Sequence, residues 1–113
     1  MIASVEELEA ATIAFADEQL TPLTVRRSTA DGFGGKDVPV LEVSIAGGQT
    51  VRAWEEGGRG DFLFEVGDAA HFGGWWAQKP AKQAELPRIV LELVSGRYEV
   101  VNGRVTVRVN GKL

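Results

Sequence analysis

The only histidine of the chain and two of its three tryptophans lie close together, between residues 71 and 76. His71 is the one side chain whose ordinary pKa lies near neutrality, so a carboxylate such as Glu55, Glu56, Asp61 or Asp68 could orient it as a general base. The chain has no cysteine and no serine in a nucleophile motif. The sequence therefore favours a protein that is not an enzyme. His71 is the one catalytic candidate, and a weak one.

The neighbouring tryptophans indicate binding rather than catalysis. Trp75 and Trp76 follow Gly73–Gly74, and tryptophan is enriched in binding hot spots while glycine lets a loop present it. The alternative is that the pair acts as a lid over the open end of a small core. The predicted partner-binding residues are Trp54, Glu55, Glu56, His71, Trp75 and Trp76.

Metal, nucleotide and adhesion motifs are absent or incomplete. One histidine and no cysteine predict no metal site, and no cofactor is expected. The glycine-rich stretch 32–36 lacks the spacing of a phosphate-binding P-loop. Arg59-Gly60-Asp61 spells the integrin-binding tripeptide, but its glycine-rich surroundings predict a turn.

The charge and hydropathy of the chain argue against two classes of partner, nucleic acids and membranes. A net charge of −4 argues against nucleic acid, which binds basic surfaces. No apolar run is long enough for a membrane span, and the N-terminus lacks the features of a signal peptide. We therefore expect a cytoplasmic protein that binds neither membranes nor nucleic acid.

A helix is predicted to begin at Ser4, because Ser4-Val5-Glu6-Glu7 is a capping-box pattern, and to stop before Pro22. Its expected buried side comprises Val5, Leu8, Thr12, Phe15, Ala16 and Leu20, with Ile13 at the margin. Residues 1–20 contain acids and no base. The opposite side is therefore a negative strip, either a solvated face or a docking face for a basic partner.

Alternating residues predict strands after this helix. Residues 23–28 form the first, and 40–45 and 50–55 form a hairpin. We expect a loop of Ala46-Gly47-Gly48 with Gly48 left-handed, because this register places Leu41 opposite Ala53 and Val43 opposite Val51. Trp54 then leaves the inner face. Residues 61–66 form the next strand, with Phe62, Phe64 and Val66 inward.

Residues 88–109 are interpreted as a three-strand antiparallel meander. Asn102-Gly103 is the dipeptide most typical of a type I′ turn, and it places Val101 opposite Arg104. Ser95-Gly96 is taken as the preceding turn. A helix over 88–95 is the competing interpretation; the β-branched Ile89, Val90 and Val94 and the short run between Pro87 and Gly96 favour a strand.

The stretch 67–87 separates this meander from the earlier strands and lacks clear strand character. Loops of this length are typically functional or contain an element, and Pro80 to Leu86 is a candidate short helix ended by Pro87. The expected fold is one α+β domain over 1–113, with the N-terminal helix packed on a curved antiparallel sheet of about six strands that ends in the meander.

The chain resembles small acidic bacterial toxin-immunity proteins. The resemblance is carried by Ser4-Val5-Glu6-Glu7-Leu8 opening a helix, by the glycine-ended strand over 41–48 and by Gly73-Gly74-Trp75-Trp76. It implies a non-catalytic protein-binding module that neutralises a toxin. A basic toxin surface would then meet the acidic helix face, Glu55 and Glu56.

Two other functions stay open at this point. A helix on a curved sheet can enclose a cone-shaped pocket of the cystatin-like or nuclear-transport-factor-like type, which binds or transforms a small apolar ligand. Its lining would be Phe62, Phe64, Trp75 and Tyr98, with His71 at its mouth. The third function is a structural or assembly subunit, for example of a phage, that uses the edge of the last strand.

Overall fold

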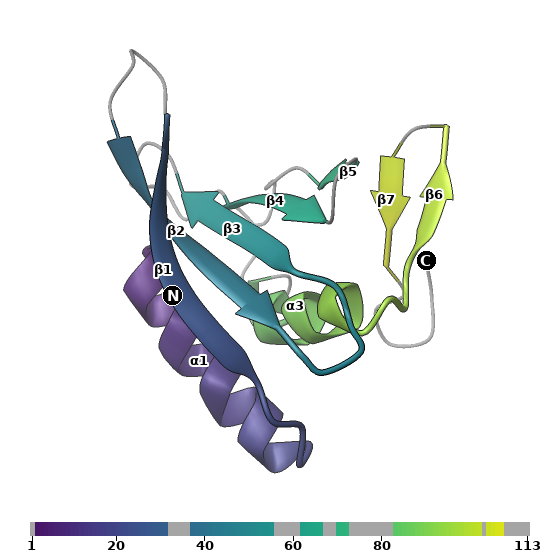
Figure 1. Cartoon of the computed structure of the whole chain (residues 1–113), viewed down its shortest axis with the longest axis horizontal. Coiled ribbons are helices and arrows are strands. Elements are labelled where there is room, and N and C mark those ends of the chain that lie inside the picture. Colours follow the sequence, from purple (N-terminus) through teal and green to yellow (C-terminus); the bar gives the residue numbers. More distant parts are fainter. Residues whose placement is uncertain are drawn as a thin grey trace.

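The computed structural model describes residues 2–31, 37–55, 62–66, 70–72, 83–102 and 104–107. These residues form helices and antiparallel strands (Figure 1). In chain order the elements are α1 (Val5–Glu18), β1 (Thr24–Asp31), β2 (Asp37–Ser44), β3 (Val51–Glu55), β4 (Phe62–Val66), β5 (Ala70–Phe72), α3 (Leu86–Val94), β6 (Glu99–Val101) and β7 (Arg104–Thr106).

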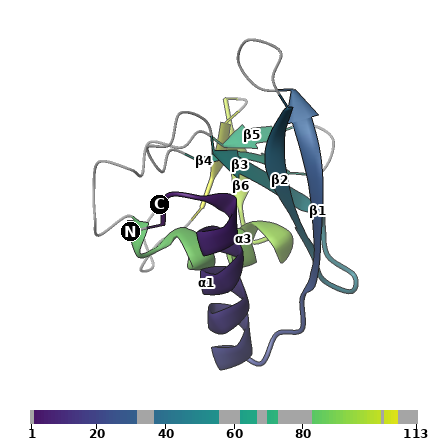
Figure 2. The same ribbon diagram turned by 90° about the vertical axis from the view of Figure 1, so that its left-hand side faces the viewer.

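Strands β1 to β5 form one sheet in sequential order, and each neighbouring pair is antiparallel. Helices α1 and α3 contact each other and lie on the same face of this sheet (Figures 1 and 2). The predicted α+β class, the N-terminal helix and the antiparallel sheet are therefore confirmed.

The hydrophobic core fills the space between this sheet face and the two helices. Alternation along β4 buries Phe62, Phe64 and Val66, as the sequence predicts. Helix α1 contributes Val5 and Leu8 to the same cluster. The remaining core residues are Leu41, Val43, Val51, Ala53, Leu86, Ile89, Val90, Leu93, Val94 and Val107.

The β2–β3 hairpin has the predicted register, with Leu41 opposite Ala53 and Val43 opposite Val51. The turn between the strands differs from the prediction. Gly47, with φ of 75°, is the left-handed residue, and the Gly48 N–H donates to the Ile45 carbonyl at 3.0 Å. A turn of this kind needs a residue that tolerates positive φ, which Gly47 supplies.

Residues 86–94 form helix α3, so the expected strand over 88–95, and with it the three-strand meander, is wrong. Val90 and Val94 are fully buried together with Ile89. In a strand, Ile89 would point to one face and Val90 and Val94 to the other, so a strand with one buried face would expose one side. A helix buries all three and leaves Arg88 and Glu92, four residues apart, at its surface. Burial on nearly all sides outweighs the weak strand preference of β-branched residues.

The ends of α3 also explain the error. Pro87 lies in the first turn of the helix, where its missing N–H is not needed, and does not end a preceding helix as expected. Gly96, with φ of 76°, ends α3 and is not the turn of a hairpin. Its N–H donates to the Leu93 carbonyl at 3.1 Å, and the Arg97 N–H donates to the Glu92 carbonyl at 2.9 Å, which is a Schellman motif.

The last two strands of the predicted meander do pair. In β6 and β7, Val101 is opposite Arg104, Val100 opposite Val105 and Glu99 opposite Thr106, which is the predicted register. Asn102 in the turn has positive φ. This pair is a separate two-stranded sheet, so the continuous six-stranded sheet is not found: the described strands form sheets of five and two strands.

Part of the expected loop over 67–87 is regular structure. β5 pairs with β4 through Val66 opposite Ala70, and α3 begins at Leu86. The stretches 56–61, 67–69 and 73–82, which contain the Arg59-Gly60-Asp61 tripeptide and most of the predicted helix over 80–86, lie outside the described residues. Across the described part of the chain, no helix is both long and apolar enough to span a membrane.

Candidate functional site

The exposed side of α1 carries an apolar residue among acids. Glu6, Ile13 and Asp17 lie on one face, because residues seven and four apart on a helix nearly coincide in direction. All three are exposed, and Ala10 between them is exposed as well. Together with Leu20, which follows the last turn, we call these residues, Glu6, Ala10, Ile13, Asp17 and Leu20, the α1 surface.

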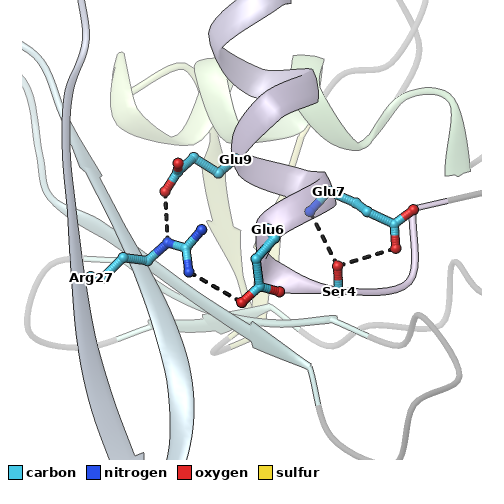
Figure 3. Close-up of polar contacts among 5 residues, drawn as sticks. All are labelled: Ser4, Glu6, Glu7, Glu9 and Arg27. Atoms are coloured by element: carbon cyan, nitrogen blue, oxygen red, sulfur yellow. Dashed lines mark hydrogen bonds and ion pairs between the residues drawn. The ribbon is translucent and has the colours of Figure 1, made fainter.

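The N-terminal end of α1 is fixed by Ser4, as predicted (Figure 3). The Ser4 hydroxyl accepts a hydrogen bond from the Glu7 N–H at 3.2 Å and donates one to the Glu7 carboxylate at 3.1 Å. The same carboxylate accepts from the Ala3 N–H at 3.4 Å, whereas the predicted capping box has it accept from the Ser4 N–H. Glu7 is thereby engaged in starting the helix.

Arg27 of β1 joins the acidic side of α1 to the sheet (Figure 3). Its Nε donates to Glu9 at 2.6 Å and its Nη1 to Glu6 at 3.3 Å. The pKa of Glu6 is lowered, first by a hydrogen bond from backbone and then by the Arg27 charge, while desolvation opposes both. Arg27 therefore compensates Glu6 and Glu9 in the first turns, whereas the acids of the last turn make no ion pair with a described residue.

The C-terminal end of α1 contains a residue in an unfavourable conformation. The Leu20 N–H donates to the Asp17 carbonyl at 3.1 Å, and the Thr21 N–H donates to the Ala16 carbonyl at 2.9 Å. This is again a Schellman motif, with Leu20 at the left-handed position, φ 55°, that glycine normally occupies. The Leu20 side chain is 90% exposed, which corrects its predicted place on the buried side of the helix.

The side-chain charges at this end of the helix are negative, whereas positive charges would stabilise it. The last turn carries Asp17 and Glu18 and no base. The carbonyl end of a helix favours cations, and each misplaced acid costs roughly 0.3–1 kcal/mol. This exposed end of α1 is thus destabilised by the left-handed backbone of Leu20 and by the negative charges of Asp17 and Glu18. Such a combination indicates a role other than stabilising the helix.

Of the six residues predicted from sequence, the structure describes Trp54, Glu55 and the backbone of His71. Trp54 and Glu55 are consecutive in β3, so they point to opposite faces of the sheet. Both are half-buried. The backbone of His71 in β5 is opposite Glu65 of β4. Glu56, Trp75 and Trp76 lie outside the described residues, so their predicted roles remain predictions.

Trp54 belongs to the sheet face that the helices do not cover. Its register partner is Leu63. Val40, which lies on the same face opposite Ser28, is fully buried but is not part of the core cluster. The Ser28 hydroxyl is buried and has no hydrogen-bond partner among the described residues. These residues form a small apolar row on the outer face of the sheet, remote from the α1 surface.

A row of charged residues runs beside this apolar row. The register places Arg26 opposite Glu42, Glu42 opposite Arg52 and Arg52 opposite Glu65. Arg52 donates to Glu65 at 3.2 Å. Opposite charges on facing strands stabilise the sheet modestly, so the row needs no ligand to explain it.

Leu20 and Ile13 are the site residues that sequence reasoning missed. Ile13 is 39% exposed and stands at the margin of the predicted apolar side. For Leu20 a signal existed: Pro22 predicts that the helix ends at or before Thr21, which places Leu20 at the helix end, where helical periodicity is a poor guide to burial.

In the described part of the chain, no group of three or more His, Cys, Asp or Glu side chains is placed to hold a metal ion. Comparisons with protein-family models, with curated proteins and with solved structures gave no match. The chemistry of the α1 surface is thus the best guide to function. A partner could bury its aliphatic side chains and pair cationic groups with its carboxylates.

Proposed function

We propose that this protein is a non-catalytic protein-binding module that docks its partner on the α1 surface. The observation that carries the proposal is Leu20, a large apolar side chain held almost fully in water by a backbone conformation that disfavours it. A left-handed conformation costs a non-glycine residue roughly 1–2 kcal/mol. Binding that buries Leu20 supplies a reason for this arrangement.

The partner that fits this surface is basic. Ile13 and Leu20 would enter shallow apolar depressions, while Asp17 would meet lysine or arginine side chains. Glu6 contributes less, because Arg27 already pairs with it. A basic toxin, which the resemblance to immunity proteins implies, is one partner of this chemistry.

The apolar anchors differ from those expected from the sequence. Trp54 lies on the sheet face opposite the helices, so it cannot belong to the same contact as α1. We therefore assign the anchor role to Ile13 and Leu20. The α1 surface presents aliphatic groups beside carboxylates on the exposed side of a helix, a combination that suits burial against a protein partner.

The pocket alternative finds no support among the described residues. Phe62 and Phe64 would line the pocket, but both are fully buried in the core, with ring centroids 6.4 Å apart. Tyr98 is half-buried and its hydroxyl donates to Gln49 at 2.7 Å. These side chains are used in packing and in joining the segment after α3 to Gln49, which follows the β2–β3 turn.

Retention of partners from native lysate on the immobilised full chain tests the proposal. Wild-type protein is compared with Leu20→Gly and Asp17→Lys, and with Arg88→Gln, a control at an exposed position of α3. A specific partner should be retained by wild type and the control, be lost from both α1 variants, and elute as salt rises and screens the charges. Equal retention by all four proteins would contradict docking on α1.

A further inference from the structure

Strand β1 is a terminal strand of the five-stranded sheet. Among the described strands its only neighbour is β2, and it lies at the margin of the sheet (Figure 2). Thr24, Arg26, Arg27 and Thr29 are exposed. In an edge strand, alternate residues direct their N–H and C=O groups away from the sheet, where they can pair with a further strand.

This edge has few of the features that prevent pairing. β1 contains neither proline nor glycine, and its register with β2 runs without a bulge from Thr24 opposite Ser44 to Asp31 opposite Asp37. It is also longer than the other described edge strand, β5. A continuous, exposed edge of this length can accept a strand over several residues.

The charged row of the outer face ends at this edge. Its order across the sheet is Arg26, Glu42, Arg52 and Glu65, with alternating sign. Arg26 is the last member and makes no ion pair with another described residue. An acid on a further strand, opposite Arg26, would continue the alternation.

We propose that β1 accepts an extended segment of another protein as a sixth, antiparallel strand, with an aspartate or glutamate of that segment opposite Arg26. Backbone hydrogen bonds along β1 provide the affinity, and the Arg26 pairing sets the register. This interaction goes beyond the proposed function, because it uses the sheet edge rather than the α1 surface, and it takes an acidic rather than a basic partner.

A second copy of the chain is a poorer occupant of this edge. When two β1 strands pair antiparallel about a two-fold axis, opposed residues lie on the same face, so Arg26 can meet only even-numbered residues. Asp31, the acid of β1, is never opposite Arg26 in such a pair. Centring the pair on Arg26 or Arg27 instead opposes two arginines.

The test uses NMR of the labelled full chain with two capped peptides about as long as β1. Each alternates valine and threonine, and they differ only in a central glutamate or lysine. The glutamate peptide should shift the amides of β1 around Arg26, should protect those whose N–H points away from β2, and should bind about 2- to 30-fold more tightly than the lysine peptide. Arg26→Glu, checked for an unchanged unfolding midpoint, should reverse this preference.

The inference would be overturned by equal or absent binding of both peptides, by a preference that Arg26→Glu leaves unchanged, or by protection that maps to β5 or α1. Concentration-dependent protection of β1 without peptide would assign the edge to a second copy and also overturn it. Leu20→Gly should leave peptide binding unchanged, so failure here and failure of the α1 docking proposal are separate outcomes.

Discussion

Leu20 and Gly96 occupy the same position in two copies of one motif. Each is the left-handed residue after a helix, with φ of 55° and 76°, and each is followed by a residue whose N–H reaches back to the helix carbonyl five positions earlier. In α3 the position is filled by glycine, the residue that adopts this conformation without strain. In α1 it is filled by an exposed leucine.

Replacing Leu20 with glycine should stabilise the protein. The substitution removes the backbone strain of α1, and we expect the free energy of unfolding to rise by about 1 kcal/mol in urea denaturation. The reciprocal change, Gly96→Ala, should lower it by about the same amount, since no atom lies near the added Cβ and only the backbone is affected. A destabilised Leu20→Gly would show that the leucine is needed for folding.

Gly48→Ala should destabilise the protein by about 1–3 kcal/mol, because the added Cβ would collide with the Ile45 side chain and the Val94 carbonyl oxygen. The neighbouring Gln49 N–H donates to that carbonyl at 3.1 Å, so the collision also disturbs the contact between the turn and α3. Gly47→Ala is the matched control: it has free space around its Cβ and suffers only from its positive φ. Thermal unfolding should rank Gly48→Ala as the more damaging change.

Thr12→Val should raise the free energy of unfolding by about 1 kcal/mol. The Thr12 hydroxyl is buried on the inner side of α1 without a hydrogen-bond partner, and an unsatisfied buried group costs roughly 1–3 kcal/mol. Thr12→Ser keeps the hydroxyl but loses a buried methyl group, and should lower stability by about 1 kcal/mol. If denaturation shows both variants to be destabilised equally, the hydroxyl contributes to stability.

Arg27→Gln should weaken the attachment of α1 to β1 by roughly 0.5–1 kcal/mol, because its ion pairs with Glu6 and Glu9 are partly exposed. Arg26→Gln, the adjacent exposed position, should change stability by less than about 0.5 kcal/mol. A loss of stability in Arg26→Gln as large as that in Arg27→Gln would show that the pairs are not the cause.

The Glu6 carboxyl gives this contact a pH dependence of defined sign. Its pKa is below the ordinary 4.5, so its contribution to stability is present above that pH and is lost as the pH falls further, through the folded-state value. In Arg27→Gln, an NMR titration should place the Glu6 pKa closer to 4.5. An unchanged pKa would assign the whole shift to the backbone hydrogen bond.

The elements that the sequence predicted correctly are those with strong local signals. Ser4 opens α1 as a capping residue, and Asn102 makes the turn of the β6–β7 pair. The register of β2 and β3 follows from facing Leu41 with Ala53, because a slip by one residue would turn every core side chain outward. Local chemistry and core packing agree at these places.

Helix α3 could not be recognised from residue preference alone. Its β-branched residues favour a strand locally, and the burial that makes it a helix depends on α1 and the sheet being in place. Pro87 just inside its start and Gly96 just past its end were the available signals. Its length and bounds are also compatible with a strand, so tertiary packing determines that these residues form a helix.

The candidate site was predicted in its charge but not in its residues. The acidic side of α1 follows from helical periodicity. The exposure of Leu20 does not follow from periodicity, because it depends on where α1 ends. Thr21 and Pro22 set that end through backbone geometry rather than hydropathy. The predicted aromatic anchor Trp54 lies on the opposite face of the sheet.

The affinity of Leu20→Gly for the partner that wild-type protein retains tests the central claim most directly. It is measured by titration calorimetry beside the free energy of unfolding. Burying a leucine stabilises a complex by roughly 1.5–3 kcal/mol, so we predict binding at least about tenfold weaker in a variant that is more stable than wild type. Unchanged affinity of Leu20→Gly would contradict docking on the α1 surface.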